Sequence, residues 1–133
     1  IKAKKLTVLC VEDNKSNLSL IEALLKRHHH VQLITAQNIK DAKILLKNQI
    51  PDLILLDLNL PDGHGKEIIN YLKKEEPLVK VNIWVLSADA TEKTKSEMIA
   101  LDIQEFFTKP LDVSLFNFKI KHLMQVSDKS IGQ

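Results

Sequence analysis

Short runs of apolar residues alternate along the chain with longer segments in which apolar residues recur every three or four positions. The short runs predict β-strands, because four to eight consecutive apolar residues are typical of strands that are buried on both faces. The longer segments predict helices, such as the one that places Leu18, Ile21 and Leu25 on one face. The predicted strands span residues 6–11, 31–36, 52–58, 81–88 and 104–108, and the predicted helices span residues 14–28, 38–49, 64–75, 91–100 and 112–126.

The order of these elements indicates the fold class. Strands that alternate with helices over short connections must run parallel, with right-handed crossover helices on both faces of the sheet. The sequence therefore predicts an α/β fold with an open, doubly wound sheet of five parallel strands and five helices. Such sheets form their sites outside the carboxyl ends of the strands, where the strand order reverses. We expect one domain over residues 1–126, followed by a polar tail or linker over residues 127–133.

The composition is that of a globular protein and limits its partners. Of the 133 residues, 44% are hydrophobic and 27% are charged, which is enough for one core without metal or disulfide support. The formal charge of +2 is too small to indicate nucleic acid or a membrane surface as a partner. The single cysteine, Cys10, lies in the run LTVLCV and is expected to be buried and inert. No segment resembles a membrane span or a signal peptide, and a cytoplasmic location is expected.

Polar side chains lie where four of the predicted strands end. Glu12 and Asp13 end the first strand, and Asp57 ends the third. Ser87 ends the fourth strand, and Lys109 follows the fifth. Three carboxylates that share one ammonium form a negative cluster of hard oxygen ligands, which suits Mg²⁺. With Mg²⁺ and Lys109 to neutralise phosphoryl oxygens, Asp57 is equipped to attack phosphorus and become an aspartyl phosphate.

Four motifs on these strand ends make the sequence similar to the receiver domains of bacterial two-component response regulators. They are VEDN, DLNLPDGHG, LSA and TKP, at residues 11–14, 57–65, 86–88 and 108–110. Each motif alone is weak, but together at these spacings they are specific, and the resemblance covers residues 5–126. It implies the flavodoxin-like strand order 2-1-3-4-5. Asp62–Gly63 in the second motif indicates a turn and nothing more.

The stretch VEDNKSN is most similar to the receivers of hybrid histidine kinases. Together with the start at Ile1 and the polar tail, it predicts a domain taken from a longer protein, such as the cytoplasmic part of a membrane-bound sensor kinase. A free-standing regulator is the alternative.

The resemblance implies which residues accept the phosphoryl group and hold the metal. Asp57 would receive the group from a phosphohistidine on a histidine kinase or a histidine phosphotransfer protein. Asp13, Asp57 and the backbone carbonyl of Asn59 would ligate Mg²⁺, and Glu12 would hold a metal-bound water. Asn59 and Asp89 are loop positions that, in the family, influence how long the phosphate survives.

The resemblance also implies which residues respond to the phosphoryl group. Lys109 would pair with the phosphate, and the Ser87 hydroxyl and the Ala88 backbone N–H would each bind a phosphoryl oxygen. The Lys109–Pro110 bond is expected to be cis. As Ser87 moves, Phe106 would swing inward and remodel the surface of the fourth helix, fifth strand and fifth helix. That surface is the expected site of homodimerisation and target binding.

Three other functions match parts of the pattern. A pseudo-receiver would bind proteins without being phosphorylated, but such domains typically lack one of the acidic, serine or lysine residues that are complete here. A phosphatase with an aspartate nucleophile usually has a second aspartate where this chain has Asn59. A nucleotide- or flavin-binding domain would need a glycine-rich loop after the first strand, and the chain has three glycines in total. We therefore expect no conventional enzyme, beyond the domain's own phosphorylation and dephosphorylation at Asp57.

Several polar and aromatic residues have structural interpretations. Glu12 and Asp13, taken alone, would fit an N-cap pair for the first helix. His28–His30 end that helix, where interaction with the helix C-terminus is preferred over a metal site. A non-glycine residue is expected in the helix-ending conformation there, and Asp102 replaces another usual glycine. Trp84 is expected to pack in the core.

The last predicted helix has two different faces. Four apolar residues at helical spacing form its predicted buried stripe: Val113, Phe116, Ile120 and Leu123. Phe118 lies roughly opposite this stripe. An exposed aromatic residue on the surface that receivers use for dimers and targets is a candidate partner contact.

Overall fold

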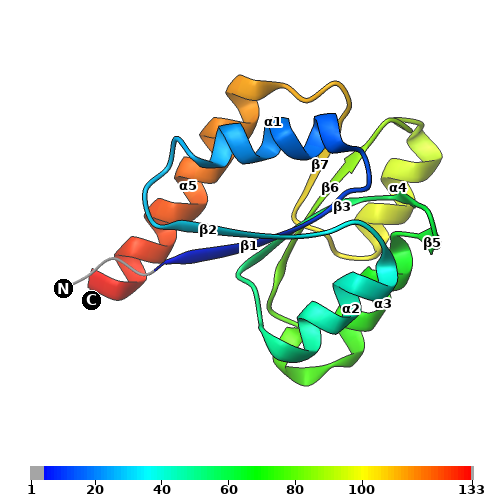
Figure 1. Cartoon of the computed structure of the whole chain (residues 1–133), viewed down its shortest axis with the longest axis horizontal. Coiled ribbons are helices and arrows are strands. Elements are labelled where there is room, and N and C mark those ends of the chain that lie inside the picture. Colours follow the sequence, from blue (N-terminus) through cyan, green and yellow to red (C-terminus); the bar gives the residue numbers. More distant parts are fainter. Residues whose placement is uncertain (1–4, 133) are drawn as a thin grey trace.

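The computed structural model describes residues 5–132, with side chains up to residue 125, and contains a parallel sheet between two layers of helices (Figure 1). The strand order is β2-β1-β3-β6-β7. This is the predicted order 2-1-3-4-5 once a short hairpin, β4–β5, is left out of the count, so the predicted fold is confirmed. The sheet strands are β1 (Leu6–Val11), β2 (Val31–Ala36), β3 (Leu53–Asp57), β6 (Asn82–Ser87) and β7 (Glu105–Thr108).

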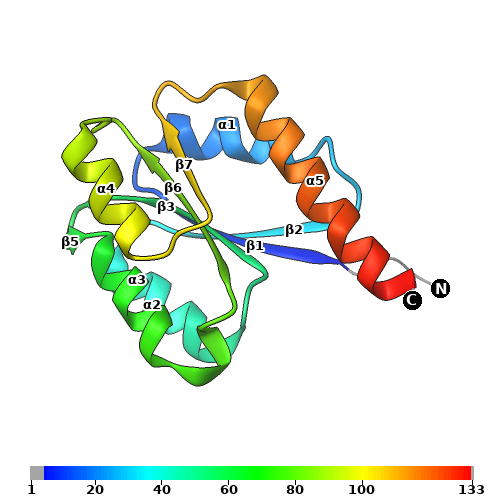
Figure 2. The ribbon, with the colours of Figure 1, turned by 180° about the vertical axis from the view of Figure 1, so that it is seen from behind.

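The five predicted helices are present and cover both faces of the sheet (Figures 1 and 2). One face carries α1 (Lys15–Leu25) and α5 (Val113–Gly132), and the other carries α2 (Ile39–Asn48), α3 (Lys66–Lys74) and α4 (Glu92–Ala100). In the described part of the chain, none of the helices combines the length and the apolar character needed to cross a membrane.

The structure differs from the sequence prediction in a few short elements. The backbone of α5 continues to Gly132, so residues 127–132, expected as a tail or linker, are helical; no proline or glycine interrupts α5 before its last residue. The hairpin of β4 (Asn59–Leu60) and β5 (Gly63–His64) and the 3₁₀ turn η1 (Glu76–Leu78) were not predicted. Strands of two residues are too short to show a hydrophobic period.

The central strand β3 is buried on both faces, which explains its continuous apolar sequence. Ile54 and Leu56 point toward α2 and α3, whereas Leu53 and Leu55 point toward α1 and α5. All four are fully buried. Successive side chains of a strand point to opposite faces, so a strand between two helical layers needs apolar residues at every position. The carboxylate of Asp57 therefore comes at the first position where this strand leaves the core.

Aromatic residues fill the core between the sheet and α5. The ring of Trp84 lies 5.6 Å from that of Phe107 and 6.0 Å from that of Phe116, which confirms the predicted core role of Trp84. Phe118 is 65% exposed, as predicted. The prediction that Val113 is buried was wrong, since 36% of it is exposed. It is the first residue of α5 and precedes the turn that carries Phe116 into the core.

Two predicted local features are also confirmed. His30 and Asp102 adopt left-handed backbone conformations, with φ of 68° and 64°, where glycine is more usual. Cys10 is fully buried, and burial raises the pKa of its thiol to about 12, so the thiol is inert at neutral pH.

Candidate functional site

The predicted site residues lie at one edge of the sheet, where four parallel strands end. Asp57 is the last residue of β3, and Ser87 is the last residue of β6. Glu12 and Asp13 directly follow β1, and Lys109 directly follows β7. The strand order reverses between β1 and β3, so the acidic residues lie at the topological switch point, where sheets of this kind bind ligands.

The side chains of this edge form a compact acidic cluster. Glu12, Asp13 and Asp57 each offer a carboxylate oxygen, and these oxygens lie within 4.8 Å of one another. Lys109 Nζ lies 2.7 Å from Glu12 Oε1 and 3.4 Å from Asp57 Oδ2. Three carboxylates and one ammonium leave two negative charges, which a divalent cation would balance. Glu12 and Asp57 are buried whereas Asp13 is exposed, so the cluster is open to solvent on the side of Asp13.

Burial and mutual repulsion give the carboxylates of this cluster different proton affinities. Burial, and then the charge of Glu12, raise the pKa of Asp57 to about 6. Burial, the largest single influence, would also raise the pKa of Glu12, but the hydrogen bonds with Lys109, the Asn14 N–H and Asp57, together with the charge of Lys109, outweigh it and hold that pKa below its ordinary value. Lys109 in turn has a raised pKa, because its contacts with Glu12 and Asp57 outweigh its burial. Of Glu12 and Asp57, it is therefore Asp57 that takes up a proton first as the pH falls.

Glu12 is held in place by the beginning of α1. Its carboxylate accepts hydrogen bonds from the Asn14 backbone N–H at 3.3 Å and from Asn17 Nδ2 at 3.1 Å. The N-cap of α1 is Asn14, whose side chain accepts from the Asn17 backbone N–H at 3.0 Å, so the interpretation of Glu12–Asp13 as a capping pair was wrong. The role of Asn17 was not predicted. Asn14 is the N-cap and Asn17 is the N3 residue of α1, and polar residues at this spacing are typical of helix starts where side chains form capping hydrogen bonds.

Gly65 allows α3 to pack closely against the strand end that carries Asp57. A Cβ atom at this position would lie 2.6 Å from the backbone oxygen of Asp57, so no other residue fits without a shift of the backbone. The Gly65 N–H donates to the Leu58 carbonyl at 2.8 Å. This contact closes the loop between β3 and α3 directly beside the acidic cluster.

Ser87 is fully buried, and its hydroxyl contacts the loop that leads to α4 rather than solvent. Its Oγ accepts a hydrogen bond from the Asp89 N–H at 3.0 Å. The Asp89 carboxylate accepts from Thr94 Oγ1 at 2.6 Å and from the Thr91 N–H at 3.0 Å. The Thr94 bond is the main cause that holds the pKa of Asp89 below its ordinary value. Asp89, expected as a loop residue whose position influences how long the phosphate survives, also joins this loop to the first turn of α4.

The remaining predicted residues lie beside these contacts. Ala88 directly follows Ser87, and the Lys109–Pro110 peptide bond is cis. Phe106 is half-buried and packs against the core that α2 and α3 cover.

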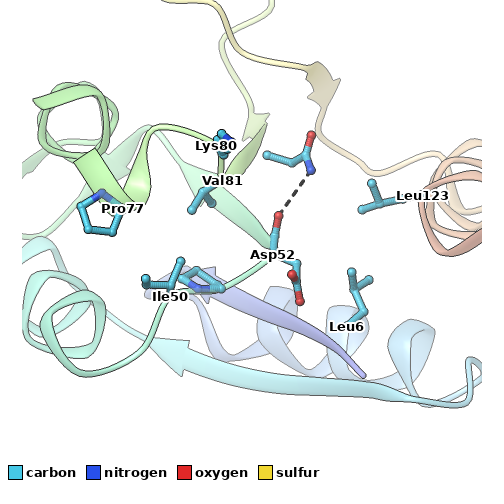
Figure 3. A pocket seen from close by; sticks show the side chains of 9 residues that line it. Leu6, Ile50, Asp52, Pro77, Lys80, Val81 and Leu123 are labelled. Carbon is cyan, nitrogen blue, oxygen red and sulfur yellow. Dashed lines mark hydrogen bonds between the residues drawn. The ribbon is translucent and has the colours of Figure 1, made fainter. Parts of the chain in front are cut away.

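A hollow of about 310 Å³ lies at the opposite end of the sheet, with Leu6 and Leu123 on one side and Ile50 and Pro77 on the other (Figure 3). Its polar groups serve the fold. The backbone carbonyl of Asp52 accepts from Asn82 Nδ2 at 3.4 Å, the dashed line in Figure 3, and its carboxylate accepts from the Thr7 N–H at 2.8 Å. The acidic cluster lies at the other end of the sheet, so the candidate site is identified by its chemical character and not by this hollow.

Comparison with known proteins shows the family of this chain, and the family has an acidic site like the one at this edge of the sheet. Residues 8–121 match the family model of the response regulator receiver domain. The chain belongs to this family. It is therefore a receiver domain of two-component signalling, a class of domain that interacts with histidine kinases or phosphotransfer proteins. Receiver domains bind Mg²⁺ or Mn²⁺ at an acidic pocket, and this chain has an acidic cluster of Glu12, Asp13 and Asp57.

Curated relatives include both kinases and regulators. The receiver is 29% identical over 122 residues to histidine kinase P4 of Formosa agariphila, a match that covers 92% of this chain and 9% of that protein. It is 29% identical over 115 residues to the polar-differentiation response regulator DivK of Brucella ovis, covering 86% of this chain and 93% of that protein. The chain thus spans a small part of the first relative and nearly all of the second.

Solved structures share the arrangement of strands and helices. The signal receiver domain of the DNA-binding response regulator merR from Colwellia psychrerythraea 34H superposes with a TM-score of 0.86 at 25% identity, covering 91% of this chain and 99% of that chain. The Mn²⁺-bound form of response regulator Rcp1 superposes with a TM-score of 0.74 at 26% identity, covering 93% and 90%.

Proposed function

We propose that this receiver accepts a phosphoryl group on Asp57 from a phosphohistidine of a histidine kinase or a histidine phosphotransfer protein. The observation that carries this proposal is the cluster of three carboxylates beside Lys109, with a net charge that calls for a divalent cation. Asp57 lies at the end of a buried strand, and the cluster is open to solvent on the side of the exposed Asp13, from which an incoming phosphoryl group would reach it. The alternative, a pseudo-receiver that acts without phosphorylation, is the outcome that would follow if the test below fails.

The acceptor step forms one bond and breaks another. A carboxylate oxygen of Asp57 attacks phosphorus, the P–N bond of the phosphohistidine breaks, and the imidazole leaves with the electron pair. Asp57 must be ionised to do this, although burial and Glu12 favour its protonated form. Lys109, which lies 3.4 Å from Asp57, neutralises phosphoryl oxygens as charge moves onto them. Ser87 and the backbone N–H of Ala88 bind the other phosphoryl oxygens.

The residues of the acidic cluster suit a small hard cation. Asp13, Asp57 and the backbone carbonyl of Asn59 would hold Mg²⁺, and Glu12 would hold a water of its coordination shell. The Asn59 N–H donates to Asp57 Oδ1 at 3.2 Å, so the backbone of Asn59 already lies beside this carboxylate. When bound, the cation supplies positive charge that favours the ionised form of Asp57 and offsets the charge of the phosphoryl group. The Mn²⁺-bound form of the related response regulator Rcp1 supports a divalent cation as the ligand.

The output is a change of the surface formed by α4, β7 and α5. Ser87 would turn toward the phosphoryl group, and the half-buried Phe106 would move inward behind it. We place homodimerisation on this surface, where Phe118 is 65% exposed.

In analytical ultracentrifugation, the phosphorylated wild type is then expected to sediment as a dimer and phosphorylated Phe118→Ala as a monomer. Identical sedimentation of the two proteins would remove Phe118 from the interface.

Phosphoryl uptake should depend on the metal. Wild-type protein incubated with Mg²⁺ and a small acyl phosphate is expected to gain one phosphoryl group by intact-mass spectrometry. The same incubation with excess EDTA should give no adduct, because the cluster then has only Lys109 to offset its charge and that of the phosphoryl group. If no adduct forms in Mg²⁺ with either the acyl phosphate or a histidine kinase as donor, the proposal is contradicted. The domain would then be a protein-interaction module that has the site residues but is not phosphorylated.

A further inference from the structure

The loop after Asp57 is attached to the beginning of helix α2 by one carboxylate, that of Asp62. Asp62 Oδ1 accepts a hydrogen bond from the Ile39 N–H at 2.8 Å, and Oδ2 accepts from the Lys40 N–H at 3.0 Å. These are the first two residues of α2, and their N–H groups have no partner within the helix. Asn38, the N-cap, accepts from the third residue of the helix. Asp62 thus completes the cap of a helix that begins more than twenty residues earlier in the chain.

A second contact joins the same loop to the same helix end. Gly63, the first residue of β5, directly follows Asp62 and has φ of 152°, and a Cβ atom at this position would lie 3.0 Å from Ile39 Cδ1. Asp62 is exposed, so its position depends on its hydrogen bonds rather than on burial. The Ile39 N–H is the main cause that holds the pKa of Asp62 below its ordinary value, so the carboxylate is ionised at neutral pH.

The hairpin that Asp62 attaches to α2 also carries Asn59. Asn59 pairs with His64 across the hairpin, and its N–H contacts the Asp57 carboxylate. The loop is fixed at its start by β3 and at its end by the contact between Gly65 and Leu58. The contact of Asp62 with α2 fixes the part between these two ends. A loop held at three places presents its backbone carbonyls in one orientation.

We propose that Asp62 is a positioning residue, which clamps the hairpin to α2 and thereby orients the Asn59 carbonyl toward the divalent cation beside Asp57. This inference rests on the proposed function, because it assigns Asn59 to the metal site. Side chains that orient metal ligands from behind typically change metal affinity by about 10- to 100-fold when they are removed.

Two alanine variants separate the clamp from a simple helix cap. Asp62→Ala and Asn38→Ala each remove acceptors from the first turn of α2, but only Asp62 lies on the hairpin. We expect Asp62→Ala to bind Mn²⁺ about tenfold more weakly than wild type. Asn38→Ala should bind within about twofold of wild type. Titration calorimetry of the full chain with Mn²⁺, well below the unfolding temperature of each variant, measures both values.

A second measurement needs no metal. Amide hydrogen exchange by NMR of the metal-free proteins should show faster exchange at Asn59 and His64 in Asp62→Ala, and no change there in Asn38→Ala. Equal effects of the two variants on Mn²⁺ affinity, or unchanged affinity in Asp62→Ala, would overturn the positioning role. Failure of the wild type to bind Mn²⁺ would instead contradict the proposed metal site. The exchange rates then decide separately whether Asp62 clamps the hairpin, and unchanged rates in Asp62→Ala would show that it does not.

Discussion

Phosphoryl uptake is expected to be lost completely when Asp57 is replaced by asparagine. The amide of Asp57→Asn has nearly the size of the carboxylate but no ionised oxygen to attack phosphorus. Intact-mass spectrometry after incubation with Mg²⁺ and a small acyl phosphate should show one added group on the wild type and none on the variant. Uptake by the variant at the wild-type rate would mean that another residue is the acceptor.

The matched control for this experiment is Asp102→Asn. It makes the same chemical change at an exposed carboxylate outside the cluster, at a residue with φ of 64°. Asparagine tolerates the left-handed conformation, so the fold should be unaffected. This control should take up one phosphoryl group as the wild type does.

The same Asp57→Asn substitution should make the metal-free protein more stable at neutral pH. Burial and the charge of Glu12 raise the pKa of Asp57 to about 6, from an ordinary value of 3.8, so the folded state disfavours the ionised form. One pKa unit corresponds to about 1.4 kcal/mol, so a rise of about two units puts the cost of the ionised carboxylate on the order of 3 kcal/mol. Asparagine removes this cost because it carries no charge.

The stability difference between the two proteins should depend on pH in a defined direction. A raised folded-state pKa means that the wild type is stabilised when Asp57 is protonated, and that this stabilisation is lost as pH rises from about 4 through about 6. In urea unfolding with EDTA, the variant's advantage should be small at about pH 4.5 and largest above pH 6. Mg²⁺ should reduce that advantage at pH 7. A difference that stays constant with pH would contradict the raised pKa.

The core between the sheet and α5 should be sensitive to the loss of one aromatic ring. Phe116 is fully buried, and its ring lies 6.0 Å from that of Trp84 and 5.8 Å from that of Phe107. Phe116→Ala is expected to lower the free energy of unfolding by about 3–5 kcal/mol, through lost burial and the cavity that remains. The free energy of unfolding of a typical domain is about 5–15 kcal/mol, so the variant should lose a large share of its stability.

Phe118→Ala is the matched control for this stability measurement. It removes the same ring two residues later on α5, from a position that is 65% exposed. Its effect on the free energy of unfolding should stay within about 0.5 kcal/mol. Urea unfolding of the unphosphorylated proteins at one pH compares the two variants directly. Similar effects would mean that the two faces of α5 are not as different as the structure shows.

The sequence by itself determined the fold class and the position of the acidic residues. Buried strands and amphipathic helices follow from local periodicity, which is visible in any window of the chain. Glu12, Asp57 and Lys109 could be placed together because parallel strands end at a common edge, so the end of each strand in the sequence gives its place in space. Trp84 and Phe118 were also assigned correctly, since their positions within a strand and a helix decide their burial.

The tertiary structure decided the features that depend on contacts between distant segments. Asp62 was expected to form only a turn, yet it caps α2 across 23 residues, which no local pattern encodes. The N-cap at Asn14 required the exact end of β1, and sequence patterns give element ends least reliably. Proton affinity was decided in the same way. Burial and the neighbouring charge of Glu12 raise the pKa of Asp57, while Lys109 lies 2.7 Å from Glu12 and 3.4 Å from Asp57; packing fixes all of these, and Asp57 becomes the group that takes the proton.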